Sequence, residues 1–223
     1  MITPIWPLLD DVTNPVIALS CGVDSLAAAH FLGRFFLGKG IQLRAWHHNH
    51  NLRPQNDTMA AKAILFCDEH HLPLTLTKRT GEAANATEGH LRNGRLEAFG
   101  ERFENSTLIT AHHLDDFVES AILNFIRGKE DHFPIPLETH LENGNRIIHP
   151  FLNTEKKDFE RRVDRFALET FLVKDETNEV TSGSRRNLIR KEIVPILERE
   201  RIGMKKIYRK KLLQRVRALY SSK

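Results

Sequence analysis

Short apolar runs alternate with helical patterns along the first half of this chain, and this alternation most constrains its fold. Four runs predict buried strands, and each is followed by a segment with apolar residues at helical spacing. The predicted strands are Asn14–Ser20, Ile41–His50, Leu72–Arg79 and Ser106–His113. Strands alternating with helices of this length form βαβ units. We therefore expect an α/β fold: an open, mostly parallel twisted sheet with helices on both faces.

The pattern changes after Gly128, where a proline-containing stretch predicts a loop with a short hairpin around Asn143–Asn145. Helical patterns follow, with Pro195 forcing a break or kink. Side chains at the start of several helices are candidate N-caps: Asp57 or Thr58, Thr87, and Asn153 or Thr154. We expect one domain over 1–223. Its parts are an α/β core (about 12–130), a loop and helical extension (about 131–198) and a basic helical tail (about 199–223).

Composition excludes several classes of protein. The 223 residues are 40% hydrophobic, which suits one compact α/β domain, and 28% charged. The two cysteines, Cys21 and Cys67, form neither a disulfide framework nor a CxxC pair, so a thiolate zinc or iron–sulfur site is not expected. We find no basic region followed by an apolar leader and no apolar run long enough for a bilayer. We therefore expect a cytoplasmic protein with no membrane partner.

Charge is distributed unevenly along the chain. The net charge is +4, and Arg199–Lys223 contains ten Lys or Arg residues against the single acid Glu200, which gives this tail +9 and leaves 4 − 9 = −5 for the remainder. A basic tail on a neutral-to-acidic body suggests a polyanion partner. Two alternatives stay open: a solvated helix face, or a homodimer helix that uses its apolar positions. These positions are Met204, Ile207, Leu212, Val216 and Leu219.

Three polar clusters follow predicted strands: "SCGVDS" (20–25), "HHNHNLR" (47–53) and "HHLDD" (112–116). In an open parallel sheet, ligands bind outside the carboxyl ends of the strands, so we expect the clusters to converge there. Main-chain N–H groups of the first cluster, at a helix N-terminus, favour an anion, and Ser20 and Ser25 add hydroxyl donors. The stretch lacks the Walker and GxGxxG patterns. The alternative is an ordinary strand-to-helix corner.

These clusters also carry a family resemblance. "SCGVDS" resembles the SGGxDS pyrophosphate loop of the N-type ATP pyrophosphatase (PP-loop) superfamily, with Cys21 at the first glycine, where a cysteine is tolerated if its side chain points into the core. "HHNHNLR" is similar to the H-x-N-H-G-L-R stretch of tRNA(Ile)-lysidine synthetases, with Asn51 for glycine. "EGHLRNGRLEAF", "TAHHLDDFVESAILNFIRG" and "KDETNEVTSGSRRNLIRKEIVPIL" resemble their later blocks, with Leu96 for Tyr, Phe117 for Gln and Ser120 for Thr. The blocks occur in family order from residue 16 to about 197.

The resemblance implies an adenine nucleotide alpha hydrolase-like fold and the catalytic N-terminal domain of such an enzyme. It implies ATP-dependent adenylation of the C2 carbonyl of the wobble cytidine in the CAU anticodon of tRNA(Ile). Adenylation releases pyrophosphate, and the ε-amine of free lysine then displaces AMP from that carbon. The implied partners are ATP, Mg²⁺, lysine and the tRNA anticodon region. The implied ATP-binding residues are Ser20, Cys21, Gly22, Val23, Asp24 and Ser25. A carboxylate repels phosphate, so Asp24 either binds Mg²⁺ or accepts hydrogen bonds from the loop's own amides.

The remaining candidate residues divide by charge. Arg92 and Arg95, three apart on a helix, are expected to share a face and to clamp phosphate or substrate; surface ion pairs such as Glu88–Arg92 are the alternative. The acidic candidates for amine or metal binding are Asp115, Asp116 and Glu119, which could instead be helix caps. The candidate proton acceptors are His113 and His50. The further substrate-binding candidates are Glu88, Arg186, Asn187 and Arg190.

Two kinds of alternative function stay open. One is another PP-loop ATP pyrophosphatase that activates a different base or amine donor. The other is a catalytically weakened nucleotide- or RNA-binding homologue, suggested by Cys21 and Phe117. The twelve histidines also raise a mixed zinc site at His50, His113 and Asp115.

Overall fold

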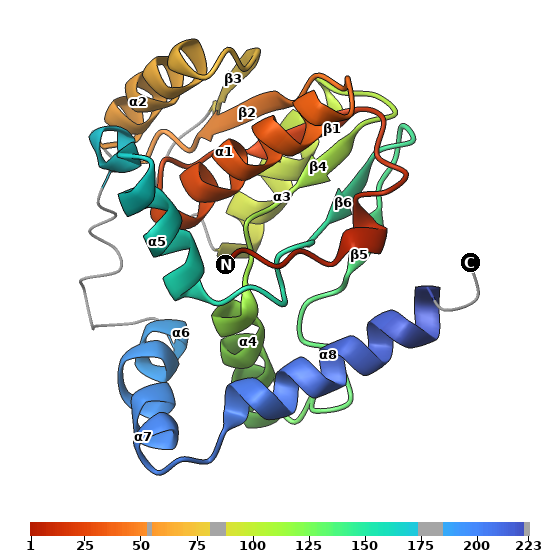
Figure 1. Cartoon of the computed structure of the whole chain (residues 1–223), viewed down its shortest axis with the longest axis vertical. Coiled ribbons are helices and arrows are strands. Elements are labelled where there is room, and N and C mark those ends of the chain that lie inside the picture. The colour runs from red at the N-terminus through yellow and green to blue at the C-terminus, as the bar shows by residue number, and fades with distance from the viewer. Residues whose placement is uncertain (53–54, 81–87, 174–184, 221–223) are drawn as a thin grey trace.

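The computed structural model describes residues 1–52, 55–80, 88–173 and 185–220. Its centre is a six-stranded sheet with the order β3-β2-β1-β4-β6-β5 (Figure 1). Neighbouring strands are parallel, except that β5 is antiparallel to β6. The bounds are β1 Pro15–Ala18, β2 Arg44–Asn49, β3 Leu74–Lys78, β4 Thr107–Ile109, β5 Glu138–His140 and β6 Arg146–Ile148. The predicted open, mostly parallel α/β fold is confirmed.

Helices cover both faces of this sheet. Successive strand residues point to opposite faces, so Val16 of β1 packs with Trp46 and Phe99 while Ile17 belongs to a larger core cluster on the other face. Helix α3 (Glu88–Gly100) supplies Phe99 to the smaller cluster. The helices that supply side chains to the larger cluster are α1 (Val23–Gly38), α2 (Gln55–Glu69) and α5 (Lys156–Arg165).

The hairpin predicted around Asn143–Asn145 is present, but its role differs from the expectation of a loop. Asn143 and Gly144 both have positive φ angles, 59° and 68°, as a tight hairpin turn requires. The turn joins β5 to β6, and β6 extends the sheet beside β4. Each of these strands has three residues, too few for a periodic sequence signal.

Several predicted helix caps are wrong or untested. Helix α2 begins at Gln55, so Asp57 lies in its first turn and its Oδ1 accepts a hydrogen bond from Asn49 Nδ2 at 2.8 Å. Helix α5 has Glu155 as its N-cap residue. Thr154 instead accepts hydrogen bonds from two other segments, at Oγ1 from Thr3 N–H and at its carbonyl from Leu114 N–H. Thr87 lies outside the described residues.

The break predicted at Pro195 is present as a change of helix type. Helix α6 (Arg185–Leu188) passes into a π-helical segment, Ile189–Ile193, and then into α7 (Val194–Arg199). Pro195 lies in the first turn of α7. Because proline has no N–H and its ring crowds the carbonyl four residues earlier, a regular α-helix cannot continue through this point. The wider π turn accommodates it.

The basic tail forms α8 (Met204–Tyr220), which packs on α4 (Leu114–Ile126) (Figure 1). Leu212 is fully buried, and Tyr208 and Val216 pack against the same core. The predicted apolar face is wrong at Ile207 and Leu219, which are 45% and 44% exposed. Of the apolar positions suggested for a homodimer helix, Leu212, Val216 and Met204 therefore pack against this chain's own core clusters, whereas Ile207 and Leu219 stay exposed. Among the described residues, no helix is long and apolar enough to cross a membrane.

Replacing Leu212 with alanine should lower the free energy of unfolding by about 2–3 kcal/mol, because a fully buried leucine leaves a cavity. Chemical denaturation measures this loss. Leu219→Ala on the exposed side of the same helix is the matched control, with an expected change within about 0.5 kcal/mol. Equal effects for the two variants would show that α8 does not dock as described.

Candidate active site

The site lies where the strand order reverses, between β1 and β4. Strand β1 pairs with β2 on one side and with β4 on its other side, so the strand order reverses between β1 and β4. Ligands of open α/β sheets bind at such a switch point. Residues 19–22 connect β1 to α1, and residues 110–113 connect β4 to α4. Asp24 Oδ1 and His113 Nε2, from the two connections, are 3.6 Å apart. The first and third polar clusters therefore converge as predicted.

Cys21 occupies the loop in the conformation that favours glycine. Its φ is 60°, its side chain is fully buried, and its Sγ–H donates to the Met59 carbonyl at 3.3 Å. Burial raises the pKa of the Cys21 thiol to about 12, so the group is an uncharged thiol at neutral pH. The condition under which a cysteine is tolerated here, a side chain that points into the core, is met. A left-handed residue other than glycine costs roughly 1–2 kcal/mol, which explains why glycine suits this position.

The two serines of the loop bond to each other and to the loop itself. Ser25 Oγ accepts from Ser20 N–H at 3.1 Å and from the Ser20 hydroxyl at 3.0 Å, and it donates to the Gly22 carbonyl at 3.0 Å. Ser25 thus fixes the turn. Gly22 is the N-cap residue of α1, and a Cβ there would meet Ser20 Oγ at 3.6 Å, an ordinary contact. The start of α1, with Val23 and Asp24 in its first turn, can present main-chain N–H groups to an anion.

Carboxylates surround His113, the N-cap residue of α4. Asp24 and Asp116 lie within 3.6 Å and 3.4 Å of Nε2, and Asp115 lies 3.6 Å from Nδ1. Burial lowers the pKa of His113, but the neighbouring carboxylates of Asp24, Asp116 and Asp115 raise it by more, so the net shift is upward. Asp116 Oδ2 also accepts a hydrogen bond from the His113 N–H at 3.0 Å.

The raised pKa of His113 predicts a pH-dependent stability. A group whose pKa is higher in the folded chain stabilises it below the unfolded value of 6.5, and this contribution is lost as pH rises through the folded pKa. In metal-free buffer, the free energy of unfolding of the wild type minus that of His113→Gln should therefore be larger at about pH 6 than at about pH 9. Chemical denaturation at both pH values measures this difference in free energy of unfolding. A difference that does not change with pH would contradict the raised pKa of His113.

Asp116 and Glu119 are paired with two arginines from α6 and the π turn. Arg190 Nε lies 2.6 Å from Glu119 Oε1, and Arg186 Nε lies 3.2 Å from Glu119 Oε2. Both guanidinium groups also reach Asp116 Oδ1, at 3.2 and 3.4 Å. The structure thus brings Asp116, Glu119, Arg186 and Arg190 together, as internal ion pairs. Asn187 lies between the two arginines in sequence, on α6.

The positive charge of Arg95 acts on histidines near the ends of several strands. Burial, and then the charge of Arg92, lowers the pKa of Arg95. After burial itself, the cation of Arg95 is among the charges that lower the pKa values of four histidines. They are His48 in β2, His50 just after it, and His112 and His149 after β4 and β6. The charge of Arg95 therefore acts at the carboxyl ends of β2, β4 and β6, and the charge of Arg92 acts on His149. That the two arginines clamp phosphate or substrate stays a prediction. The side chain of Glu88, the first residue of α3, lies outside the described part of the structure.

Two further groups were missed from sequence. His149 is buried and lies 3.2 Å, Nδ1 to Nδ1, from His112, with Thr110 Oγ1 against both rings. Burial lowers the pKa of His112 to about 4 and that of His149 to about 3, so both are neutral near pH 7. A histidine directly after a short strand, in "RIIHP", was the available signal.

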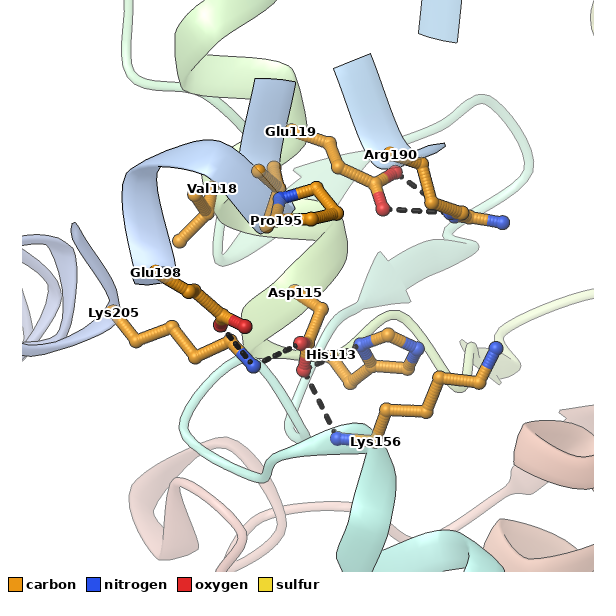
Figure 2. A pocket seen from close by; sticks show the side chains of 10 residues that line it. His113, Asp115, Val118, Glu119, Lys156, Arg190, Pro195, Glu198 and Lys205 are labelled. Atoms are coloured by element: carbon orange, nitrogen blue, oxygen red, sulfur yellow. Dashed lines mark hydrogen bonds and ion pairs between the residues drawn. The ribbon is translucent and has the colours of Figure 1, made fainter. Parts of the chain in front are cut away.

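Lys205 is the second missed group. Its ammonium lies 2.6 Å from Asp115 Oδ1 and 2.9 Å from Glu198 Oε1 (Figure 2). Burial raises the pKa of Asp115, but hydrogen bonds from Lys205 and from the Lys156 N–H lower it by more. These residues, with His113, Glu119 and Arg190, line a cavity of about 210 Å³.

The residues present fit a cation better at Asp24 than at the proposed zinc site. Among the described residues, no group of three or more His, Cys, Asp or Glu side chains is arranged to hold a metal ion, so the mixed site at His50, His113 and Asp115 is not formed. Asp24 Oδ1 is buried and accepts no hydrogen bond from the described residues. A carboxylate oxygen of this kind suits Mg²⁺, which takes one or two carboxylates together with phosphate oxygens.

Comparisons with known proteins agree with this geometry. The PP-loop domain family model matches residues 8–197. A tRNA(Ile)-lysidine synthase from Actinobacillus pleuropneumoniae serotype 3 (strain JL03) is 32% identical over 188 residues, 82% of this chain and 43% of that protein. One from Staphylococcus aureus (strain MRSA252) is 29% identical over 201 residues, 86% of this chain and 45% of that protein. The chain thus spans less than half the length of these curated relatives.

A solved structure shows the same fold. The U34-tRNA thiolase NcsA from Methanococcus maripaludis, described with its [4Fe-4S] cluster, superposes with a TM-score of 0.71 at 19% sequence identity, covering 95% of this chain and 76% of that one. At this identity the likeness concerns the fold alone. The family match over most of the chain and the motif resemblance agree, and the chain belongs to the PP-loop domain family.

Proposed function

We propose that this chain is an ATP-dependent carbon–nitrogen ligase that modifies tRNA in the manner of a tRNA(Ile)-lysidine synthetase. It would adenylate the C2 carbonyl of the wobble cytidine in the CAU anticodon and join that carbon to lysine, releasing AMP and pyrophosphate. The similarity to curated tRNA(Ile)-lysidine synthases over 82–86% of this chain supports the proposal. The substrates are proposals here because the chain spans under half of those proteins.

The observation that carries the proposal is the meeting of Asp24 and His113 at 3.6 Å. It brings the start of α1, which suits phosphate, against an acidic cluster, which suits an amine or a metal. One substrate with negative charge and one with positive charge can therefore be held side by side. A joining reaction between an activated carbonyl and an amine requires that proximity.

The phosphates are assigned to the loop 20–25. Main-chain N–H groups from Gly22 onward would face phosphate oxygens, and the buried Asp24 Oδ1 would hold Mg²⁺, which offsets phosphate charge. Ser20 and Ser25 act mainly by fixing the turn, and Cys21 supplies its left-handed residue. Arg92 and Arg95, on the same edge of the sheet, would stabilise charge that develops on pyrophosphate.

The lysine amine is assigned to the carboxylates of α4. Asp115, which lines the cavity, already holds an ammonium group, that of Lys205 at 2.6 Å, so its position suits an amine. Asp116 and Glu119 are held by Arg190, so the lysine amine would share these carboxylates with that cation. The amine must lose a proton before it attacks. His113 is the more basic of the two candidate acceptors, whereas burial lowers the pKa of His50, which is neutral near pH 7. The acidic pair Asp116 and Glu119 would be positioned by Arg186, Asn187 and Arg190. These three residues would also contact the RNA.

The test is incubation of the full chain with ATP, Mg²⁺, labelled lysine and a tRNA(Ile) transcript with a CAU anticodon. Label in the RNA, dependent on ATP, supports the proposal. Pyrophosphate release that requires RNA but leaves no lysine in it would indicate a different amine donor. Binding of ATP or RNA without either product would indicate a homologue without turnover. A transcript with a UAU anticodon is the matched control and should stay unlabelled.

A further inference from the structure

Five of the seven basic residues of α8 form two sets on different sides of the helix, and Lys211 and Arg215 lie outside both sets. Lys205 and Arg209 face the body of the molecule, where Lys205 pairs with Asp115 and Glu198, and Arg209 Nη2 lies 2.8 Å from Glu155 Oε1. These pairs fix the helix to α4 and α5. Lys206, Lys210 and Arg217 lie within about 40° of one another around the helix, at 100° per residue, and all three are exposed. We call these three residues the outer stripe.

The outer stripe has no compensating acids on its own helix. Residues Met204–Tyr220 contain no Asp or Glu, and no ion pair within the described part of the chain involves Lys206, Lys210 or Arg217. Lys206 and Lys210 are four residues apart, a spacing at which like charges repel on a helix. Lys206 also lies in the first turn, where the helix dipole disfavours a cation. The stripe therefore weakens α8 when nothing negative lies against it.

The position of α8 relates the stripe to the candidate active site. The helix begins at the cavity, which Lys205 lines together with His113, and runs 17 residues, about 25 Å, away from it (Figures 1 and 2). A long polyanion with one residue bound in the candidate active site would pass beside α8. A membrane surface fits less well, because a membrane-bound helix inserts its apolar face, whereas Leu212, Tyr208 and Val216 of α8 pack against this chain's own core.

We propose that the outer stripe, Lys206, Lys210 and Arg217, docks the phosphate backbone of the RNA substrate. This inference rests on the proposed function for the choice of RNA as the polyanion. The stripe contacts phosphates without reading sequence, and it orients the RNA toward the site. The inward set, Lys205 and Arg209, holds the helix in place and takes no direct part in RNA binding.

The test compares the wild type with a triple variant, Lys206→Gln, Lys210→Gln and Arg217→Gln, in binding to the CAU-anticodon transcript across a range of salt concentrations. Each phosphate contact to a single strand adds about 0.7 to the slope of log K against log salt. Loss of three contacts should flatten the slope by about 2 and weaken binding at least tenfold at low salt. Because the three side chains point outward and their charges repel one another, the melting temperature should stay unchanged or rise.

The matched control removes the same charge elsewhere, with Lys39→Gln, Arg102→Gln and Arg165→Gln, three exposed cations on other elements. It should keep the wild-type slope. An unchanged slope in the stripe variant, an equal loss in the control, or no RNA binding by the wild type would overturn the proposal. So would a stripe variant that loses binding to anionic vesicles while RNA binding stays intact. If lysine is not incorporated but the stripe variant alone flattens the slope, the proposed function fails and the docking surface stands.

Discussion

Asp24→Ala should abolish measurable pyrophosphate release, with a loss of at least about 10³-fold. Asp24 is the first-turn carboxylate of α1, it lies 3.6 Å from His113, and its buried Oδ1 accepts no hydrogen bond from the described residues. Removing it takes away the proposed Mg²⁺ ligand. Loss of a single group that stabilises developing charge lowers the rate of a catalysed reaction by about 10²–10³-fold. A pyrophosphate assay with ATP, lysine and the CAU transcript measures the loss.

The control for this prediction is Asp68→Ala, which removes an exposed carboxylate from α2 and should release pyrophosphate at the wild-type rate. Both variants should keep their fold, because the Asp24 side chain is 34% exposed. Wild-type release by Asp24→Ala would remove the metal and phosphate assignment altogether.

Gly22→Ala separates phosphate binding from folding at the same loop. The added Cβ would meet Ser20 Oγ at 3.6 Å, so the chain itself accommodates it, and Gly22 has a negative φ of −82°. We therefore expect a free energy of unfolding within about 1 kcal/mol of wild type, since cap and entropy effects oppose each other. If phosphate approaches this main chain closely, the KM for ATP should rise; an unchanged KM would place the phosphates elsewhere.

Arg190→Ala should lower the free energy of unfolding by about 3 kcal/mol. Glu119 is almost fully buried, with 4% of its side chain exposed, and Arg190 holds it through contacts of 2.6 and 2.8 Å. Removing the cation leaves a buried carboxylate without its main partner, and breaking such a pair costs about 3–5 kcal/mol. We expect the lower end because the Arg190 side chain is 33% exposed. Urea denaturation measures the change.

Two companion variants identify the cause of this loss. Arg186→Ala should cost less, since its contacts to Glu119 and Asp116 are longer, 3.2 and 3.4 Å. Adding Glu119→Leu to an Arg190→Met background should recover stability, because an apolar pair of similar volume avoids the burial of an unpaired charge. If the double variant is as unstable as Arg190→Ala, packing rather than the lost ion pair is responsible.

Strand and helix order, and the edge of the sheet that holds the site, were predictable from sequence. β1 to β4 and α1 to α4 each have a periodic pattern or a continuous apolar run, and these patterns reflect local burial. The carboxyl ends of parallel strands share one edge, which is why loop 20–25 and residues 112–116 could be placed together in advance. The conformation at Cys21 was also foreseeable, because the motif position calls for glycine.

Other features had no local signal. β5 and β6 are three residues each and are strands because they pair with β4 and with each other. The partners of Asp116 and Glu119 come from residues about 70 positions later, and Thr154 caps no helix because it bonds to Thr3 and Leu114. Packing decided which face of α8 points toward the core. Tyr208 packs against the core, whereas Ile207 is exposed.

The sequence alone thus determined β1 to β4 and the helices between them, which residues end the central strands, and that the tail is basic, since each follows from neighbours within a few positions. Only the tertiary structure decided which charges neutralise each other inside the molecule and which stay outside. Ion pairs depend on distances of a few ångströms between residues far apart in the chain, and sequence spacing does not encode those distances.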